Sequence, residues 1–246
     1  NLSIGANSVS DISGNNGPST TTTASAVTID NGPPIAVLTP ATLKNSQSAT
    51  VRLNKLGVVY LVKSTVSVAT ESDITSAAGN TWNSVNVTAT DSDTSLSLTG
   101  LVDGTYRAYG VDAQNRLSVV STTSVSVDTT APSAPVSVVL DSSSDTGTSS
   151  SDGITKDNTP TIRIVASENG GTVTVTASRV FQNDVVCTVT GSTVGSTCDL
   201  SSIVDGVWTL SAVQTDAAGN FSTSVTGSMS IDTVGPTVSG VSTNSA

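Results

Sequence analysis

The sequence predicts an all-β fold built from repeated β-sandwich domains. Serine and threonine make up about a third of the 246 residues, a composition that disfavours helices and suits strands. Apolar residues alternate with polar ones or form short runs, and glycine-containing turns separate these segments. Similar sequence motifs also recur after about 100 residues, which predicts several domains of one type.

The repeat defines the domain boundaries. The segment 101–132 matches 203–236, and residues 1–31 match the later part of the same unit. We therefore expect the C-terminal strands of a partial repeat at 1–31 and complete domains at 32–129 and 130–233. A linker and the first strand of a following repeat are expected at 234–246. The aligned positions include Tyr106 with Trp208, Asp112 with Asp216, and Asp128 with Asp232.

Within one repeat, about seven short strands with frequent turns are typical of an immunoglobulin-like β-sandwich. The only stretch with possible helical content is 68–79, and its shortness favours a loop. An Asp-Gly turn precedes Tyr106, which predicts a tyrosine corner at that position. The same turn precedes Trp208. Because Trp208 lacks a hydroxyl, we expect it only to pack.

Charge and composition exclude several functions. The net charge is −10 and no basic patch is present, which argues against nucleic-acid binding. Histidine is absent, so catalytic triads and histidine metal sites are excluded. The only glutamates are Glu71 and Glu168, which disfavours glycoside hydrolysis. The sequence therefore predicts that the protein is not an enzyme.

Cys187 and Cys198 flank a turn-like stretch. A disulfide across that hairpin would indicate an oxidising compartment, and the alternative is two free thiols. No stretch is as long and apolar as a membrane span, so we expect no membrane insertion in this segment. We expect an extracellular protein whose secretion signal lies outside this segment.

Aspartates recur in pairs: Asp11 with Asp30, Asp112 with Asp128, and Asp216 with Asp232. Abundant aspartate without histidine points to hard cations such as Ca²⁺, which take oxygen ligands. Two alternatives remain open. The acidity can serve solubility alone, and the aspartates can cap turns through their own hydrogen bonds.

These motifs carry a family resemblance. The segment 141–236, with "DGVW", "DAAGN" and "DTVGP" in fixed order, resembles bacterial Ig-like repeats of large surface adhesins and biofilm-associated proteins. The first complete repeat resembles them from "LVDGTY" to "VDTTAP", whereas residues 35–95 depart from the pattern. The resemblance implies tandem domains in an elongated rod, with Ca²⁺ at the domain junctions.

Strand direction indicates which aspartates share an ion. The linker enters a domain at the end that carries its F–G loop, so we expect Asp128 to pair with Asp216, and Asp30 with Asp112. Asp11 and Asp232 hold the equivalent positions at the outer repeats. Asp141 and Asp145 lie at the opposite end of the domain and would belong to a different site. Arg116 stands where the second repeat has Asn220, which weakens the expected Asp112 site.

The resemblance implies a structural spacer of a bacterial surface adhesin, biofilm matrix or filament. Its partners would be neighbouring repeats of the same chain and other copies in a filament or matrix. The alternative is an adhesive module that recognises a glycan or a protein through its loops. Few aromatic or arginine side chains occupy those loops, which favours the spacer.

Overall fold

The computed structural model describes residues 3–4, 9–10, 12–17, 22–23, 32–237 and 239–240. The chain divides into two compact units, Asn1–Pro33 and Pro34–Ala246. Among the described residues of the first unit, β1 (Ser3–Ile4) pairs with β4 (Thr22–Thr23) and β2 (Val9–Ser10) pairs with β3 (Asn16–Gly17), both antiparallel.

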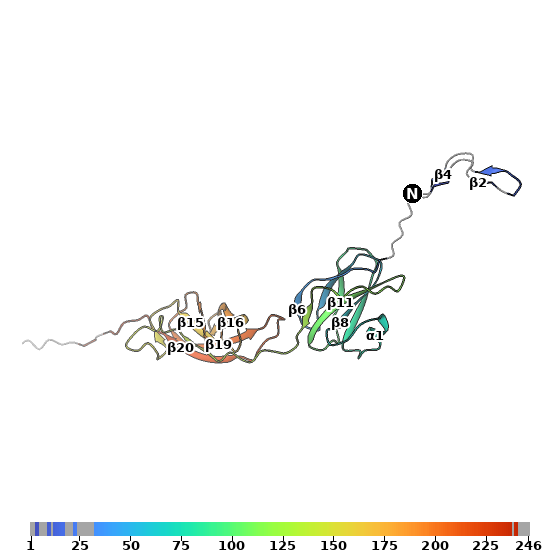
Figure 1. Cartoon of the computed structure of the whole chain (residues 1–246). Helices are drawn as coiled ribbons and strands as arrows, with labels where there is room; N and C mark the ends of the chain where they lie inside the picture. Colours follow the sequence, from blue (N-terminus) through green and yellow to red (C-terminus); the bar gives the residue numbers. More distant parts are fainter. Residues whose placement is uncertain are drawn as a thin grey trace, which may run out of the picture. The chain divides into compact units, whose positions relative to one another are not determined.

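The second unit contains two β-sandwiches, which confirms the predicted fold class (Figure 1). In the first sandwich, a three-stranded sheet faces a five-stranded one. The smaller sheet has the order β10 (Thr94–Ser97), β7 (Ser48–Leu53), β5 (Ala36–Leu38). The larger has the order β6 (Ala41–Leu43), β12 (Val125–Val127), β11 (Gly104–Asp112), β8 (Gly57–Lys63), β9 (Trp82–Val87).

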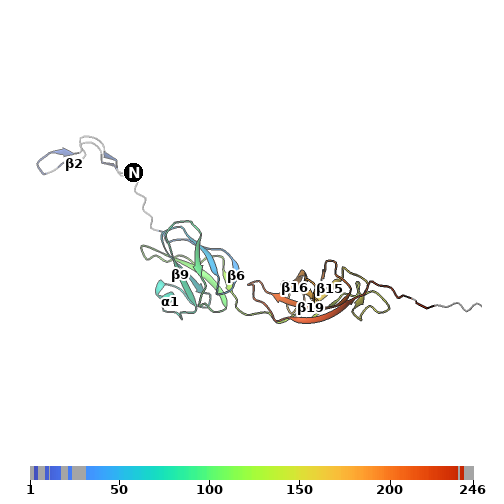
Figure 2. The same cartoon turned by 180° about the vertical axis from the view of Figure 1, so that it is seen from behind.

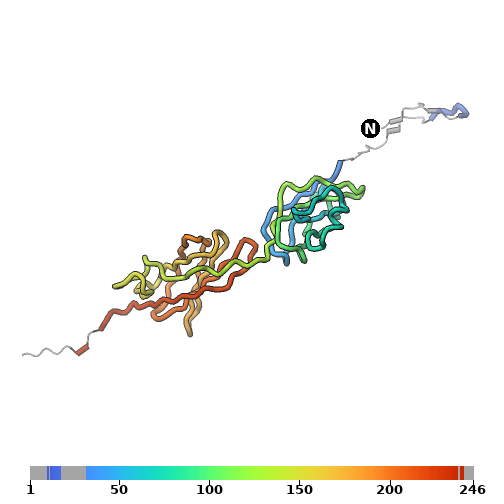
Figure 3. The backbone as a smooth tube through the Cα atoms, turned by 60° about the horizontal axis from the view of Figure 1, so that its bottom comes forward, coloured from blue at the N-terminus to red at the C-terminus, as the bar shows by residue number. Residues whose placement is uncertain are grey.

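The second sandwich repeats this topology strand for strand. Its smaller sheet has the order β13 (Ser137–Leu140), β15 (Thr161–Val165), β18 (Ser196–Asp199). Its larger sheet has the order β14 (Ile154–Thr155), β20 (Val225–Ile231), β19 (Gly206–Thr215), β16 (Gly170–Ser178), β17 (Val185–Gly191). Figure 3 shows β19 and β20 as the long orange and red hairpin.

Alternation along the strands builds each core, because every second side chain of a strand points to the same face. In β19 the inward side chains include Trp208 and Leu210, and in β11 they include Tyr106; all three are buried. Gly227 lets the two sheets of the second sandwich approach closely. A Cβ atom there would lie 2.3 Å from the carbonyl oxygen of Val138.

Tyr106 and Trp208, the aromatic residues that follow the two Asp-Gly turns, each make a hydrogen bond to the main chain. The Tyr106 hydroxyl donates to the carbonyl of Val102 at 2.6 Å, as predicted. The expectation that Trp208 only packs was wrong. Its indole Nε1–H donates to the carbonyl of Val204 at 2.9 Å. The two side chains thus reach the carbonyl four residues earlier through different chemical groups.

The segment 68–79 contains a short helix rather than only a loop. Helix α1 (Glu71–Thr75) begins after Thr70, whose main-chain N–H donates to the Asp73 carboxylate at 2.7 Å. Ile74 is fully buried in a small cluster with Tyr60 and Trp82 on the outer face of the larger sheet. Figures 1 and 2 both show α1 beside the β8–β9 side of the sandwich. Tyr60, Ile74 and Trp82 of this cluster lie within residues 35–95, the part of the first repeat whose sequence differs from the second repeat.

Candidate functional site

The loop that follows β19 is a tight turn organised by Asp216. The main-chain N–H of Asp216 donates to the carbonyl of Asn220 at 3.1 Å, and its Oδ1 accepts the N–H of Asn220 at 2.8 Å. Gly219 adopts a φ of +90° inside the turn, as its position predicted. The sequence forms this turn because aspartate accepts local N–H groups and glycine adopts the left-handed conformation.

Asn220 connects this loop to the first sandwich. The residue is only 8% exposed. The Nδ2 group donates to Asp216 Oδ2 at 2.9 Å and to the main-chain carbonyl of Asp128 at 3.0 Å. The Asp128 carboxylate instead accepts the N–H of Thr130 at 3.0 Å. The structure therefore brings the Asp216 loop to the main chain of Asp128 through an amide.

Lys44 and Phe221 make a second contact between the two sandwiches, beside the hydrogen bond from Asn220 to Asp128. The Lys44 ammonium of the first sandwich lies 5.3 Å from the centre of the Phe221 ring, within the range of a cation–π interaction. The Lys44 side chain also runs close to Gly219, where an added Cβ would lie 3.7 Å from its Cε. We call Lys44, Asp128, Asp216, Asn220 and Phe221 the junction site. Sequence reasoning missed Lys44, because nothing in its local sequence marks it.

The equivalent loop of the first sandwich has the same backbone but a different charge pattern. Asn115 adopts a left-handed φ of +58°, as expected from its alignment with Gly219. Arg116 Nε donates to Asp112 Oδ2 at 2.8 Å, and the main-chain N–H of Arg116 donates to Oδ1 at 3.0 Å. Lys55 Nζ lies 3.8 Å from Asp112 Oδ2. Two cations thus neutralise the buried Asp112 carboxylate.

Both loop carboxylates are stabilised as anions. Burial acts to raise the pKa of Asp216, but hydrogen bonds from the Asn220 side chain and main chain outweigh it and lower that pKa. Burial also acts to raise the pKa of Asp112. There the main-chain N–H and guanidinium of Arg116 outweigh burial and lower the pKa. The two loops therefore hold charged aspartates through different partners.

Three further aspartates were predicted as metal ligands. Asp11 and Asp30 are outside the described residues, so the predicted pairing of Asp30 with Asp112 stays a prediction. Asp232 is exposed, and its Oδ1 accepts the N–H of Val234 at 3.2 Å. Its position after β20 repeats that of Asp128 after β12.

Two aspartates that sequence reasoning treated only as turn formers also hold the chain after the last strand. Asp103 Oδ1 accepts the N–H of Thr129 at 2.9 Å, and Asp205 Oδ2 accepts the N–H of Thr233 at 3.1 Å. The threonine hydroxyls donate to the same carboxylates. A signal was present, since an Asp-Thr pair follows the last strand in both repeats.

The two loop aspartates differ in how well they fit Ca²⁺. Within the residues that the structure describes, no group of three or more Asp, Glu, His or Cys side chains is arranged to hold a metal. Asp112 does not fit, because Arg116 and Lys55 already neutralise it. Asp216 fits better. Its carboxylate and the Asp128 carbonyl both accept hydrogen bonds from the Nδ2 group of Asn220. If the Asn220 amide turned over, its oxygen would take the place of Nδ2, and three oxygen atoms would then face one point.

A disulfide joins Cys187 and Cys198, with their Cα atoms 5.9 Å apart. The expected location across a hairpin was wrong. Cys187 lies in β17 of the larger sheet and Cys198 in β18 of the smaller sheet, so the bond joins the two sheets. Cys198 is buried in the core of the second sandwich.

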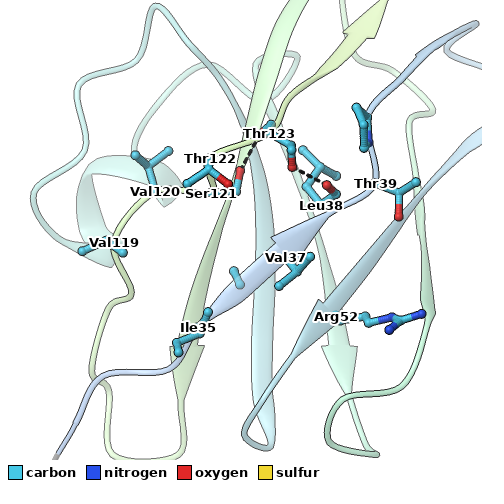
Figure 4. A pocket seen from close by; sticks show the side chains of 12 residues that line it. Ile35, Val37, Leu38, Thr39, Arg52, Val119, Val120, Ser121, Thr122 and Thr123 are labelled. Atoms are coloured by element: carbon cyan, nitrogen blue, oxygen red, sulfur yellow. Dashed lines mark hydrogen bonds between the residues drawn. The ribbon is translucent and has the colours of Figure 1, made fainter.

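The first sandwich has an apolar cavity of about 480 Å³ along the outer edge of β5. Ile35, Val37 and Leu38 line one side, and the segment 119–123 lines the other (Figure 4). The Thr123 hydroxyl donates to the carbonyl of Leu38 across this cavity. The cavity exists in the first sandwich because residues 119–124, which precede β12, form no strand with β11. In the second sandwich the corresponding strand β20 pairs with β19 from Val225 onward.

The second sandwich is similar to a known family. Residues 131–233 match the family model described as bacterial Ig-like domain. No curated protein matches the chain. In the described residues, no helix is long and apolar enough to cross a membrane.

Several solved structures are similar at low identity. The BSP domain of a biofilm-associated protein is 14% identical, with 83% of this chain and 30% of that chain covered and a TM-score of 0.27. A tetra-tandem repeat from the extending region of a large adhesion protein is 19% identical, with coverages of 81% and 50% and a TM-score of 0.30. A two-domain fibronectin type III segment of chicken tenascin is 15% identical, with coverages of 80% and 98% and a TM-score of 0.33.

Proposed function

We propose that this chain is a non-catalytic, extracellular spacer of a bacterial surface adhesin, biofilm-matrix or filament protein. The observation that carries the proposal is the repetition of one sandwich topology, with a side chain of the second sandwich bonded to the end of the first. A spacer needs each domain to fold on its own core and to hold its neighbour at a junction. The buried cores and the junction site meet these two needs.

The segment between the sandwiches supports this role. Only residues 128–136 separate β12 from β13, and Pro132 and Pro135 restrict its backbone. Asp103 fixes the start of the segment by accepting hydrogen bonds from Thr129 and Thr130. A short, restrained connection transmits orientation from one domain to the next. Its partners in this role are neighbouring repeats and other copies in a filament or matrix.

We extend the proposal to Ca²⁺ at the junction site. Asp216 and the main-chain carbonyl of Asp128 would hold the ion, with Asn220 turned to present its amide oxygen. A bound cation would tie the two sandwiches together more strongly than one neutral hydrogen bond. The rest of its coordination would come from water, because among the described residues Asp216 is the only carboxylate that accepts a hydrogen bond from the Asn220 amide.

Small-angle scattering of the whole chain tests the calcium proposal. With Ca²⁺ we expect a narrower range of molecular dimensions than with a chelator, and calorimetry should lose one bound ion in Asp216→Asn. Asp112→Asn is the matched control, because Asp112 is neutralised by Arg116. Identical scattering and stoichiometry in the wild type and Asp216→Asn would refute junction calcium and leave the spacer proposal standing.

The spacer role itself has a separate test. In the full-length protein, residues 34–236 are replaced by two unrelated sandwiches, or deleted. If the segment is a spacer, surface adhesion should survive replacement, because the length of the protein is kept. Adhesion should weaken on deletion, because the protein then extends less far from the cell surface. Loss of adhesion after replacement would contradict it.

That result would favour the alternative, an adhesive binding module. The apolar cavity beside β5 is the observation in its favour, because Ile35 and Val37 are each more than half exposed there. An extended peptide with apolar side chains could lie along this edge. Val37→Asp would then abolish binding to the target surface, whereas a spacer would tolerate it.

A further inference from the structure

The C-terminal end of the second sandwich repeats the face that the first sandwich presents at the junction site. In the first sandwich β6 and β12 pair in parallel, and the N–H of Asp128 donates to the carbonyl of Leu43 at 2.9 Å. In the second sandwich β14 and β20 pair in parallel, and the N–H of Asp232 donates to the carbonyl of Thr155 at 2.8 Å. Asp128 and Asp232 therefore hold the same place in the two folds.

A lysine follows at this edge in both sandwiches. Lys44 comes directly after the last residue of β6, and Lys156 comes directly after the last residue of β14. One step beyond the last paired residues, Lys44 therefore lies opposite Asp128, and Lys156 lies opposite Asp232. The two ends of the sandwiches thus carry the same cation beside the same main-chain group.

The two lysines differ in what they contact. Lys44 meets the Phe221 ring of the second sandwich, and the Asp128 carbonyl accepts the Asn220 amide. Lys156 and Asp232 are both exposed. Within the described residues, the Lys156 side chain forms no hydrogen bond or ion pair, and no group donates to the Asp232 carbonyl. We call Lys156 and the Asp232 carbonyl the exit face.

The chain leaves both faces in the same way. The carboxylate of an Asp-Gly turn holds the threonine that follows each aspartate, with Asp103 bound to Thr129 and Asp205 bound to Thr233. A proline then follows each aspartate after four residues, at Pro132 and Pro236. Because the connecting segment starts from the same anchors, it would bring a following domain to the exit face as it brings the second sandwich to the first.

The loops that could meet the exit face differ between the two sandwiches. After β19 the loop ends with Asn220 and Phe221, which supply an amide donor and a ring face. After β11 the corresponding residues are Arg116 and Leu117, and the bridge formed by Phe221 recurs at Leu117. The Arg116 guanidinium is bound within its own loop and would bring a second cation towards Lys156. Leucine has no π-face for an ammonium group.

We propose that the exit face docks a domain whose loop carries asparagine followed by an aromatic residue, as the second sandwich does. The asparagine amide donates to the Asp232 carbonyl, and the ring receives the Lys156 ammonium. A further copy of the second sandwich fits this face, whereas a copy of the first sandwich does not. Two loop residues thus decide which repeat can follow which. The inference rests on the proposed spacer role and deepens it by naming the neighbouring repeat that the chain accepts.

Two extended chains test the proposal. In one, a copy of residues 133–233 replaces everything after Pro236, and in the other a copy of residues 35–129 does so. Both keep the natural spacing between the aspartate and the added sandwich, because Ser133 and Ile35 each lie five residues after an aspartate. NMR residual dipolar couplings report whether neighbouring domains share one orientation. The measurement is made with a chelator, so that the proposed junction calcium contributes nothing.

We expect the added copy of the second sandwich to share one alignment with its neighbour, and the added copy of the first to align independently. Arg116→Asn with Leu117→Phe, made in that added copy, should restore the shared alignment. Lys156→Gln should loosen the new junction and leave the existing one unchanged. Lys44→Gln should do the reverse, so each lysine variant is the matched control for the other.

Equal alignment of the two added copies, or an unchanged new junction in Lys156→Gln, would overturn the inference. If the existing junction stays ordered in that case, the rule for neighbour choice fails and the spacer proposal stands. If the existing junction also lacks a shared alignment, its contacts do not orient the domains, and the inference fails with them. The spacer proposal is refuted separately, by loss of adhesion when residues 34–236 are replaced.

Discussion

The side-chain amide of Asn220 donates a hydrogen bond to the main-chain carbonyl of Asp128, 3.0 Å away and in the other sandwich. The same amide holds Asp216, so one side chain both completes its own loop and contacts the neighbouring domain. In the first sandwich Arg116 occupies this position and holds Asp112. The identity of this single residue therefore distinguishes the two loops.

Removing the amide should weaken the second sandwich. Asn220→Ala leaves the partly buried Asp216 Oδ2 without the donor that holds its charge, which we expect to cost about 1–3 kcal/mol of unfolding free energy. Urea unfolding of the whole chain measures this loss. Asn183→Ala, at an exposed turn, is the control and should stay within about 0.5 kcal/mol of the wild type.

An arginine at the same position should separate the two roles of Asn220. Asn220→Arg can pair with Asp216 as Arg116 pairs with Asp112, but it cannot donate to Asp128 in the same way. We expect near-normal stability together with faster independent tumbling of the two sandwiches, measured by NMR relaxation. Unchanged tumbling would show that Asn220 does not restrain the junction.

The aromatic corners predict a matched pair of substitutions. Tyr106→Phe removes only the hydroxyl that donates to Val102, so the first sandwich should lose about 0.5–1.5 kcal/mol. Trp208→Phe removes the indole N–H and also leaves a cavity in the second core, so its loss should be larger, about 2–4 kcal/mol. Equal losses would contradict this account. Denaturant unfolding followed by circular dichroism provides the measurement.

The disulfide should stabilise only the second sandwich. Cys187 and Cys198 close a short loop and join its two sheets, so replacing both with serine should cost about 2–3 kcal/mol. Hydrogen exchange resolves the two domains separately. The core strands of the second sandwich should exchange faster in the double variant, and those of the first should not change. Faster exchange in both would show that the sandwiches unfold together.

Much of the fold followed from patterns that are local in the sequence. Period-two alternation and Asp-Gly turns predicted the sandwich, and the alignment of Asp112 with Asp216 predicted two loops of the same backbone shape. Helix α1 was missed because five residues give too short a periodic signal. The indole hydrogen bond of Trp208 was not predicted because the tyrosine-corner pattern is defined by a hydroxyl donor, whereas here an N–H group donates to the equivalent carbonyl.

The candidate sites were harder to predict because they depend on distant partners. Strand direction predicted that the Asp216 loop lies near Asp128, and their shared ion stays a prediction. No local signal identified the Asn220 amide as the group that bonds to the Asp128 carbonyl. The equivalence of Lys156 with Lys44 is likewise invisible in the sequence. It depends on which strands pair in the folded sandwiches, because residues 35–95 differ from the second repeat.

The loop aspartates predict how stability depends on pH. The pKa values of Asp112 and Asp216 are lowered in the folded protein from a usual value of 3.8. A lowered folded-state pKa contributes stability that is fully present above the unfolded pKa and is lost as the pH falls through the folded pKa. Each sandwich should therefore lose stability below about pH 4, with no loss from these groups between pH 5 and 8.

Two variants assign this acid sensitivity to the loops. Arg116→Ala removes the guanidinium that helps to lower the pKa of Asp112, so the first sandwich should show a flatter pH dependence between about pH 2 and 5. Asp216→Asn removes the titrating group of the second sandwich and should flatten only that domain. Each variant serves as the control for the other domain. Hydrogen exchange at several acidic pH values, corrected for the intrinsic exchange rate, reports both domains at once. If both variants keep the wild-type slope in their own domain, the acid sensitivity arises from other carboxylates.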